Sequence, residues 1–199
     1  MSLRKLVSSA MAVAFALSVM VGTFSGCASS DKALKIAMLP KFKGENYFDA
    51  CKTGALETID ELNKDGKTVE FLYEGPPQDQ ATNQKQVDIL EGWIAQKVNV
   101  IIVSPNDPTA IAPTLKKAQS KGIKVLTYDA DAQADARDMF VNQVASEGIA
   151  EGLVAAMARG LKDRGYGDSN PANIAIVSSA KTDANQQAWL ASIKELFKK

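Results

Sequence analysis

The sequence contains no histidine, and its only cysteines are Cys27 and Cys51. Without histidine, the chain lacks an imidazole general base, the catalytic triads that use one, and the commonest transition-metal ligand. Two cysteines cannot form a metal cluster by themselves. The 23 basic and 23 acidic side chains cancel, so no net charge attracts nucleic acid or an acidic membrane surface. We therefore expect no enzyme, no metal, no cofactor and no nucleic-acid partner.

The N-terminus has the order of a secretory signal peptide over residues 1–26. A short basic start and a run of small apolar residues lead to a serine–glycine pair directly before Cys27. This order is typical of a bacterial lipoprotein, in which the cysteine is lipidated, and residues 27–33 would then be a lipidated tether. An ordinary signal peptide cut nearby and a retained membrane anchor are the alternatives. Lipidation of Cys27 would anchor the exported chain to a membrane of the cell envelope.

Strand-like apolar runs and amphipathic helical patterns alternate from residue 34 onward, which predicts an α/β doubly wound parallel sheet. Asp107 as N-cap and Pro108 at the first helical position predict the start of the third helix. The expected strands are 36–39, 68–73, 99–104, 123–128, 139–141 and 172–177. The expected helices are 47–63, 79–96, 108–120, 146–164 and 185–198. We expect one lobe over 34–143 and the start of a second over 144–199.

Polar side chains follow most of the expected strands, at the edge of an open α/β sheet where ligands bind. Amides, carboxylates and an ammonium group suit a neutral polyol, and aromatic rings can cover its apolar face. No glycine-rich loop that would hold a phosphate or a dinucleotide follows these strands. The candidate ligand-binding residues are Lys41, Phe48, Asn106, Asp129, Asn142, Asn185 and Gln186.

Several of these candidates have a purely structural alternative. Asn106 could serve a turn, and Asn142 could satisfy backbone groups at a hinge. Asn185 could cap a helix, and Phe48 could belong to the core.

Other residues are expected to have structural roles. Asp129 together with Asp131 could indicate a hydrolase or a metal site, but no further acidic cluster accompanies the pair. Cys51 has no histidine to lower its thiol pKa, so we expect it to pack within the first helix. We also expect Trp93 and Trp189 to serve packing.

Four segments carry a resemblance to a known family: KIAMLPK at 35–41, YEGP at 73–76, VSPNDP at 103–108 and VLTYDAD at 125–131. Together they resemble the periplasmic sugar-binding proteins of ABC importers, most of all the branch with the rhamnose-binding and autoinducer-2-binding proteins. The similarity covers about residues 34–198. It implies two α/β lobes joined by a hinge, which close on a ligand and dock to a membrane permease.

The resemblance also implies site residues. The lysine of the family's Pro-Lys pair and the aspartate that ends a later strand bind ligand, and they correspond to Lys41 and Asp129. A pair from the second lobe precedes a tryptophan, and anchoring on Trp189 places Asn185 and Gln186 there. The autoinducer-2 branch has aspartate at the position of Asn185, so this departure favours a pentose or deoxyhexose.

The family's second lobe is longer than residues 144–199, so the resemblance implies an incomplete second lobe. We expect a lipid-anchored, monomeric solute-binding protein that captures a small sugar or sugar-like signal for an ABC permease. Two alternatives remain open. One is a sensor module that feeds a signalling receptor, and the other is a sugar-acting α/β enzyme with Asp129 as its base.

Overall fold

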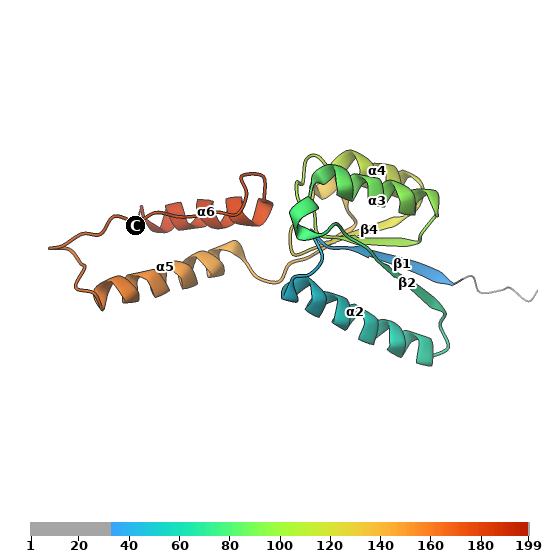
Figure 1. Cartoon of the computed structure of the whole chain (residues 1–199), viewed down its shortest axis with the longest axis horizontal. Helices are drawn as coiled ribbons and strands as arrows, with labels where there is room; N and C mark the ends of the chain where they lie inside the picture. Colours follow the sequence, from blue (N-terminus) through green and yellow to red (C-terminus); the bar gives the residue numbers. More distant parts are fainter. Residues whose placement is uncertain (1–32, 199) are drawn as a thin grey trace, which may run out of the picture. The chain divides into compact units, whose positions relative to one another are not determined.

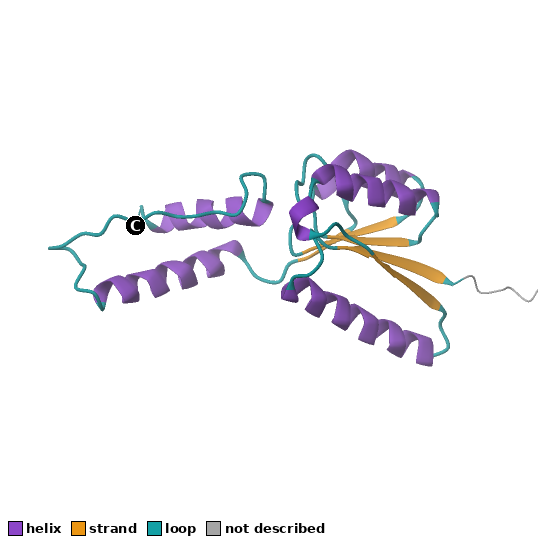
Figure 2. Ribbon diagram, in the orientation of Figure 1, coloured by secondary structure: helices purple, strands orange, loops and turns teal. Residues whose placement is uncertain are grey.

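Five strands form one parallel sheet in the order β2-β1-β3-β4-β5 (Figure 2). The computed structural model describes residues 33–198. The strands are β1 Leu34–Leu39, β2 Val69–Tyr73, β3 Val100–Val103, β4 Lys124–Tyr128 and β5 Met139–Val141. A parallel sheet with helical crossovers confirms the predicted fold class.

The predictions for the N-terminus fall outside the described residues. They are the signal peptide over residues 1–26, the lipidation of Cys27 and nearly all of the tether. Within residues 33–198, no helix is both long and apolar enough to cross a membrane.

Three of the five α-helices among the described residues, α2, α3 and α6, begin at a residue whose side chain accepts from a free backbone N–H group. Thr82 caps α3 by accepting a hydrogen bond from the Lys85 backbone N–H at 3.2 Å. The helices are α2 Asn46–Lys64, α3 Asn83–Ala95, α4 Ala112–Ser120, α5 Ser146–Lys162 and α6 Ala184–Leu196. Short 3-10 turns occur at η1 Gln78–Gln80 and η2 Ala134–Ala136.

The core lies on both faces of the sheet because successive side chains of a strand point to opposite faces. In β1, Ala37 and Leu39 are fully buried in the cluster that includes residues of α3 and α4. Met38 lies in a second cluster with Phe48 of α2. Helices α3 and α4 accordingly cover one face and α2 the other (Figure 1).

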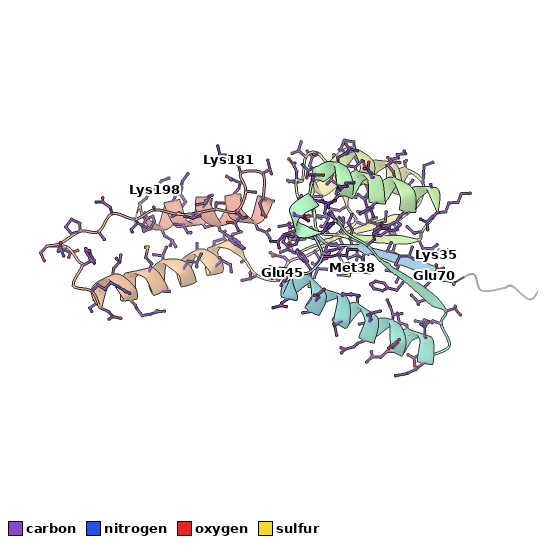
Figure 3. The ribbon with its side chains drawn as sticks, in the orientation of Figure 1. Lys35, Met38, Glu45, Glu70, Lys181 and Lys198 are labelled. Atoms are coloured by element: carbon purple, nitrogen blue, oxygen red, sulfur yellow. The ribbon has the colours of Figure 1, made fainter. Side chains whose placement is uncertain are left out.

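The pairing of β1 with β2 places Lys35 beside Glu70 (Figure 3). Their charged groups lie 3.1 Å apart, but both side chains are well exposed. Exposed ion pairs contribute about 0–1 kcal/mol, so the register depends on the buried apolar side chains of these strands instead.

The helix predicted to begin at Pro108 begins later, at Ala112. The Asp107 carboxylate accepts hydrogen bonds from the backbone N–H groups of Thr109 and Ala110, at 2.8 and 3.0 Å. These bonds form an Asx-type turn that competes with helical geometry. The predicted start and the predicted N-cap role of Asp107 were therefore wrong, because α4 follows Ile111 and the Asp107 carboxylate bonds the turn before the helix instead.

The strand predicted at residues 172–177 does not form. A strand needs a neighbour for its backbone hydrogen bonds, and among residues 33–198 no strand pairs with this segment. Its side chains remain exposed, including Ile176 at 49% and Val177 at 95%. Helices α5 and α6 do form, and they pack against each other.

Candidate functional site

Lys41 lies directly after β1 at the carboxyl edge of the sheet, and its side chain is buried. The loop that carries it is fixed on both sides. Gly75 approaches the Pro40 ring so closely that a Cβ atom at residue 75 would lie 2.9 Å from Pro40 Cγ. The Lys43 backbone N–H donates to the Pro76 carbonyl at 2.9 Å. Close packing and backbone pairing therefore determine where the Lys41 ammonium lies.

Asp129 follows β4 with a backbone φ of 60°, in the left-handed region that few residues other than glycine adopt. This conformation costs free energy, of the order of 1–2 kcal/mol for an ordinary residue. Aspartate is among the residues that tolerate it, because a short polar side chain can bond locally. Strain of this kind often marks functional sites. Here it occurs at the residue that the sequence made the main ligand-binding candidate.

The Lys41 ammonium and two carboxylates form an ion cluster, which we call the lysine cluster (Lys41, Asp129 and Asp183). Lys41 Nζ lies 3.3 Å from Asp129 Oδ2 and 2.9 Å from Asp183 Oδ2. The three side chains are only 10–15% exposed. Ser104 Oγ donates a 2.7 Å hydrogen bond to Asp129 Oδ2. One cation against two carboxylates gives the cluster a formal charge of −1.

Asp183 was missed as a site residue because anchoring on Trp189 assigned its role to Asn185. The carboxylate caps α6, and Oδ1 accepts from the backbone N–H groups of Asn185 and Gln186 at 3.0 and 3.3 Å. Capping this helix was the structural alternative for Asn185, but the residue that caps it is Asp183. A cap signal was present, since an aspartate directly precedes the helical pattern. That signal alone does not indicate that Oδ2 contacts Lys41.

Asn185 also reaches the cluster, since its side-chain Nδ2 donates to Asp129 Oδ1 at 3.2 Å. Gln186 does not, because its side chain accepts from Ser178 Oγ at 3.2 Å instead. Of the two candidates from the expected second lobe, the structure therefore brings only Asn185 to Asp129.

The remaining candidates lie around the cluster rather than in it. Asn106 Nδ2 donates to the Lys41 backbone carbonyl at 3.3 Å, so it supports the lysine loop. Asn142 Oδ1 accepts a hydrogen bond from the Val144 backbone N–H at 3.3 Å. This agrees with the structural alternative, in which Asn142 pairs with free backbone groups after β5. Phe48 is 4% exposed and packs edge-on against other aromatic rings, which places it in the core.

Gln143 links Asp129 to α2. Its Nε2 lies 3.5 Å from Asp129 Oδ1, and its Oε1 accepts a hydrogen bond from the Tyr47 hydroxyl. Burial and the nearby negative charge of Asp129 both raise the pKa of Tyr47. The hydroxyl consequently stays protonated at neutral pH and keeps its donor role.

Gln86 of α3 is a fully buried side chain that the sequence did not single out. Its Nε2 donates to the carbonyls of Pro40 and Ser104 at 3.1 and 2.8 Å. Its Oε1 accepts from the Asn106 backbone N–H at 2.9 Å. One amide thus joins the loop that carries Lys41 to the loop that carries Ser104. In the sequence, Gln86 is one polar residue among others in a predicted helix, so nothing there indicates this role.

Replacing Gln86 with methionine should lower the free energy of unfolding by about 2 kcal/mol, because it leaves two buried carbonyls and one partly buried N–H group unpaired. Urea unfolding measures the change. Gln84→Met is the matched control, since Gln84 is exposed on the same helix and bonds only Asp88. Equal effects of the two substitutions would contradict the role assigned to Gln86.

Asp131 is held by protein groups at both oxygens. Arg137 Nε donates to Oδ1 at 2.6 Å and Arg137 Nη2 to Oδ2 at 2.7 Å. Thr127 Oγ1 also donates to Oδ1, at 2.7 Å. Burial alone would raise the pKa of Asp131, but the hydrogen bonds from Arg137 and Thr127 outweigh it and lower the pKa. We infer that Asp131 fixes the loop after β4.

The Asp131–Arg137 pair should stabilise the fold fully only where Asp131 is ionised in both the folded and the unfolded state. Because folding lowers this carboxyl pKa, its contribution is present above the unfolded value of about 3.9 and is lost as the pH falls through the folded pKa. The difference in unfolding free energy between wild type and Arg137→Met should therefore shrink below about pH 4. Urea unfolding from pH 7 to pH 3 tests this, with the exposed-pair variant Lys117→Met as control. A difference independent of pH would contradict it.

A cavity of about 220 Å³ lies beside the lysine cluster. It is bounded by Asp129, by residues of β5 and the chain that follows it, and by the first turns of α6. Asn142 and Asn185, two of the predicted site residues, line it. Three larger cavities lie elsewhere: about 410 Å³ along α3, about 650 Å³ near the amino ends of β3 and β4, and about 280 Å³ between α5, the segment 174–177 and α6. None of the three is lined by Lys41 or Asp129.

The site is built from side chains that donate and accept hydrogen bonds. Among residues 33–198, no group of three or more histidine, cysteine or acidic side chains is placed to hold a metal. Ammonium, carboxylate, amide and hydroxyl groups converge within one buried edge, and most of them bond one another. Such a set can exchange these internal bonds for bonds to the hydroxyls of a small polar ligand.

The chain is similar to a known protein family and to several solved structures. Residues 36–199 match the family model of the periplasmic binding protein domain. Among similar solved structures, LsrB from Clostridium saccharobutylicum in complex with AI-2 is 26% identical, with a TM-score of 0.69, over 82% of this chain and 48% of that one. An ABC transporter solute-binding protein from Clostridium phytofermentas with bound L-rhamnose is 28% identical, with a TM-score of 0.71, over 84% and 48%.

A third such protein, from Burkholderia graminis in complex with D-arabinose, is 28% identical, with a TM-score of 0.69, over 83% of this chain and 52% of that one. The chain therefore spans about half the length of these solved structures. The neighbours from Clostridium phytofermentas and Burkholderia graminis are solute-binding proteins of ABC transporters. The family match covers most of the sequence, and the chain belongs to the periplasmic binding protein domain family.

Proposed function

We propose that this protein captures a small neutral monosaccharide, such as L-rhamnose or a pentose, and delivers it to the permease of an ABC importer. The observation that carries the proposal is the lysine cluster at the carboxyl edge of the sheet, next to a cavity of about 220 Å³. Drug-sized ligands occupy pockets of roughly 300–1,000 Å³, so this cavity suits a single sugar ring.

The charge of the cluster supports a neutral ligand. Asp129 and Asp183 together exceed the one positive charge of Lys41, and all three are mostly buried. A sugar acid or sugar phosphate would bring another negative charge close to two carboxylates in a region of low dielectric, where repulsion is strong. Sugar hydroxyls can instead donate to the carboxylates and accept from Lys41 and Asn185.

An AI-2-like ligand is the second candidate. The expectation against it depended on asparagine at residue 185, where the resemblance implied aspartate. Asp183 supplies a carboxylate 2.9 Å from Lys41 Nζ, so the site does not lack that group. A similar solved protein was also determined in complex with AI-2.

The proposed site residues are Lys41, Asp129, Asp183 and Asn185, with Asn106 supporting the lysine loop and Asn142 at the cavity wall. We further propose a lipid anchor at Cys27, a place in the cell envelope and a monomeric state. A sensor protein would bind its ligand at the same site. The two roles differ in the partner protein, which is a signalling receptor for a sensor and a permease for an importer.

A thermal-shift screen tests the proposed function. The panel contains L-rhamnose, D-arabinose and AI-2, with D-glucuronate as an anionic control. A ligand that binds only the folded state adds about 2.7 kcal/mol of stability at a hundredfold excess over its Kd, so the matching sugar should raise the midpoint clearly. No shift with any neutral ligand would contradict the proposal. Conversion of a sugar in the same wells would favour an enzyme.

A further inference from the structure

The amino ends of the strands form an edge of the sheet whose charge is opposite to that of the sugar-site edge. We call the turns that lead into β2, β3 and β4 the amino edge (residues 64–68, 96–99 and 120–124). Besides the acidic Asp65, they contain five lysines: Lys64, Lys67, Lys97, Lys121 and Lys124. The segments that follow β1 to β4 (40–45, 74–79, 104–110 and 129–131) contain two lysines and six acidic residues. The zero net charge of the chain therefore conceals a separation of charge between the two edges.

Lys97 has a backbone conformation that suits glycine better than lysine. Its φ is 55°, in the left-handed region, and it ends α3 with a hydrogen bond from the Val98 N–H to the Trp93 carbonyl at 3.3 Å. Helices α2 and α4 end with the same bonding pattern, but they place Gly66 and Gly122 at this position. Cations are favoured near helix C-termini, yet the helix dipole does not require a lysine in a glycine position. The side chain at residue 97 is thus kept at a cost to stability, as is common at functional sites.

The cavity of about 650 Å³ near the amino ends of β3 and β4 lies at this edge. Its lining combines ammonium groups with apolar side chains, namely Lys97, Lys117 and Lys121 with Ile94, Val98 and Ile123. Lys117 pairs with Glu91 at 2.6 Å. Among residues 33–198, no ion pair engages Lys97 or Lys121. Two free ammonium groups beside apolar surface suit an anionic group at the boundary of a lipid layer.

The same edge is where the chain enters the sheet. Asn99 lines the cavity, and its Oδ1 accepts a hydrogen bond from the Lys35 backbone N–H at 2.8 Å. Lys35 lies at this end of β1 in Figure 3. Cys27, the proposed lipid anchor, precedes Leu34 by seven residues. An extended chain of that length spans at most about 25 Å, so an anchor at Cys27 keeps the amino edge close to the membrane surface.

We propose that the amino edge docks on the anionic headgroups of the membrane that carries the protein, with Lys97 and Lys121 bound to lipid phosphates. This inference rests on the lipid anchor of the proposed function and adds an interaction surface to it. Each lysine near an anionic surface increases the affinity for that surface by about fivefold. Docking directs the lysine cluster, at the opposite edge, toward the solution from which the sugar is captured. Because ionic docking is reversible, it also allows release to a permease.

Lysine labelling on vesicles tests the docking. The protein as it matures in the cell is mixed with vesicles of phosphatidylglycerol and phosphatidylcholine in equal parts, or of phosphatidylcholine alone. Mass spectrometry then follows the acylation of each lysine. On the anionic vesicles, Lys97 and Lys121 should react at least about fivefold more slowly, and about 1 M salt should remove the difference. Lys181 and Lys198, outside the amino edge, should react equally on both (Figure 3).

Equal reactivity of Lys97 and Lys121 on the two kinds of vesicle would overturn the inference. Equal protection by free glycerol phosphate without vesicles would also overturn it, because the cavity would then be a site for small anions. Sedimentation with the neutral vesicles reports on the anchor alone. A protein that does not sediment with them contradicts the proposed anchor, whereas an anchored protein without protected lysines contradicts only the docking.

Substitutions at Lys97 separate docking from stability. Lys97→Gly should raise the midpoint of thermal unfolding, because glycine favours the left-handed position, and should weaken the protection of Lys121 on anionic vesicles. Lys97→Arg keeps the charge and should protect Lys121 as wild type does. Lys181→Gln is the control for loss of an exposed lysine elsewhere. A Lys97→Gly variant that is less stable than wild type and still protects Lys121 would assign Lys97 a structural role and overturn the inference.

Discussion

Replacing Lys41 with methionine should abolish sugar binding and lower the free energy of unfolding by about 3 kcal/mol or more. Methionine keeps most of the side-chain volume but removes the ammonium between Asp129 and Asp183. The two carboxylates would then face each other without a cation, and breaking a buried ion pair in this way is far more costly than losing an exposed one. Calorimetry with L-rhamnose and urea unfolding measure the two effects.

Lys43→Met is the matched control for this prediction. Lys43 lies two residues away in the same loop, and its side chain is exposed. Its backbone bond to Pro76 does not depend on the side chain. The control should bind sugar as wild type does and change stability by less than about 0.5 kcal/mol. Similar behaviour of the two variants would mean that the lysine cluster has no special role.

Asp129→Asn should weaken sugar binding by about 10- to 100-fold, the range expected for the loss of a hydrogen bond to a charged group. Asparagine tolerates the left-handed backbone, so the change removes the charge without straining residue 129. Calorimetry gives the affinity. Asp129→Ala should be less stable than Asp129→Asn by about 1 kcal/mol, because alanine does not favour this conformation.

Asp131→Asn is the control for the substitution at Asp129. It makes the same chemical change two residues away, at a carboxylate held by Arg137 and Thr127. We expect it to reduce stability while changing the sugar Kd by less than about threefold, because Asp131 lines the cavity but Thr127 and Arg137 already bind its two oxygens. A larger loss of affinity at Asp131 than at Asp129 would contradict the assignment of the two aspartates.

Much of the parallel sheet could be predicted because its strands are continuous apolar runs between clear turns. β3 and β4 each have one fully buried face and one that is at least partly covered, so their apolar runs are nearly continuous in the sequence. Topology then places Lys41 and Asp129 on the same edge, since parallel strands share the end at which ligands bind. The structure places these two side chains in contact.

Other features depend on contacts that no local pattern reports. Gln86 resembles any polar residue of a helix until the carbonyls that it binds are brought together by the fold. Asp183 shows its capping role in the sequence but not its contact with Lys41, which lies 142 residues away. The segment 172–177 has the composition of a strand, yet composition does not supply a pairing neighbour.

The most direct test of the account is a calorimetric titration of the wild-type chain with L-rhamnose, D-arabinose and D-glucuronate in turn. We expect at least one of the two neutral sugars to bind saturably at a single site, and the anionic D-glucuronate to give no saturable heat. Absence of binding by both neutral sugars, or tighter binding of D-glucuronate, would contradict the claim that the lysine cluster and its cavity form a neutral-sugar site.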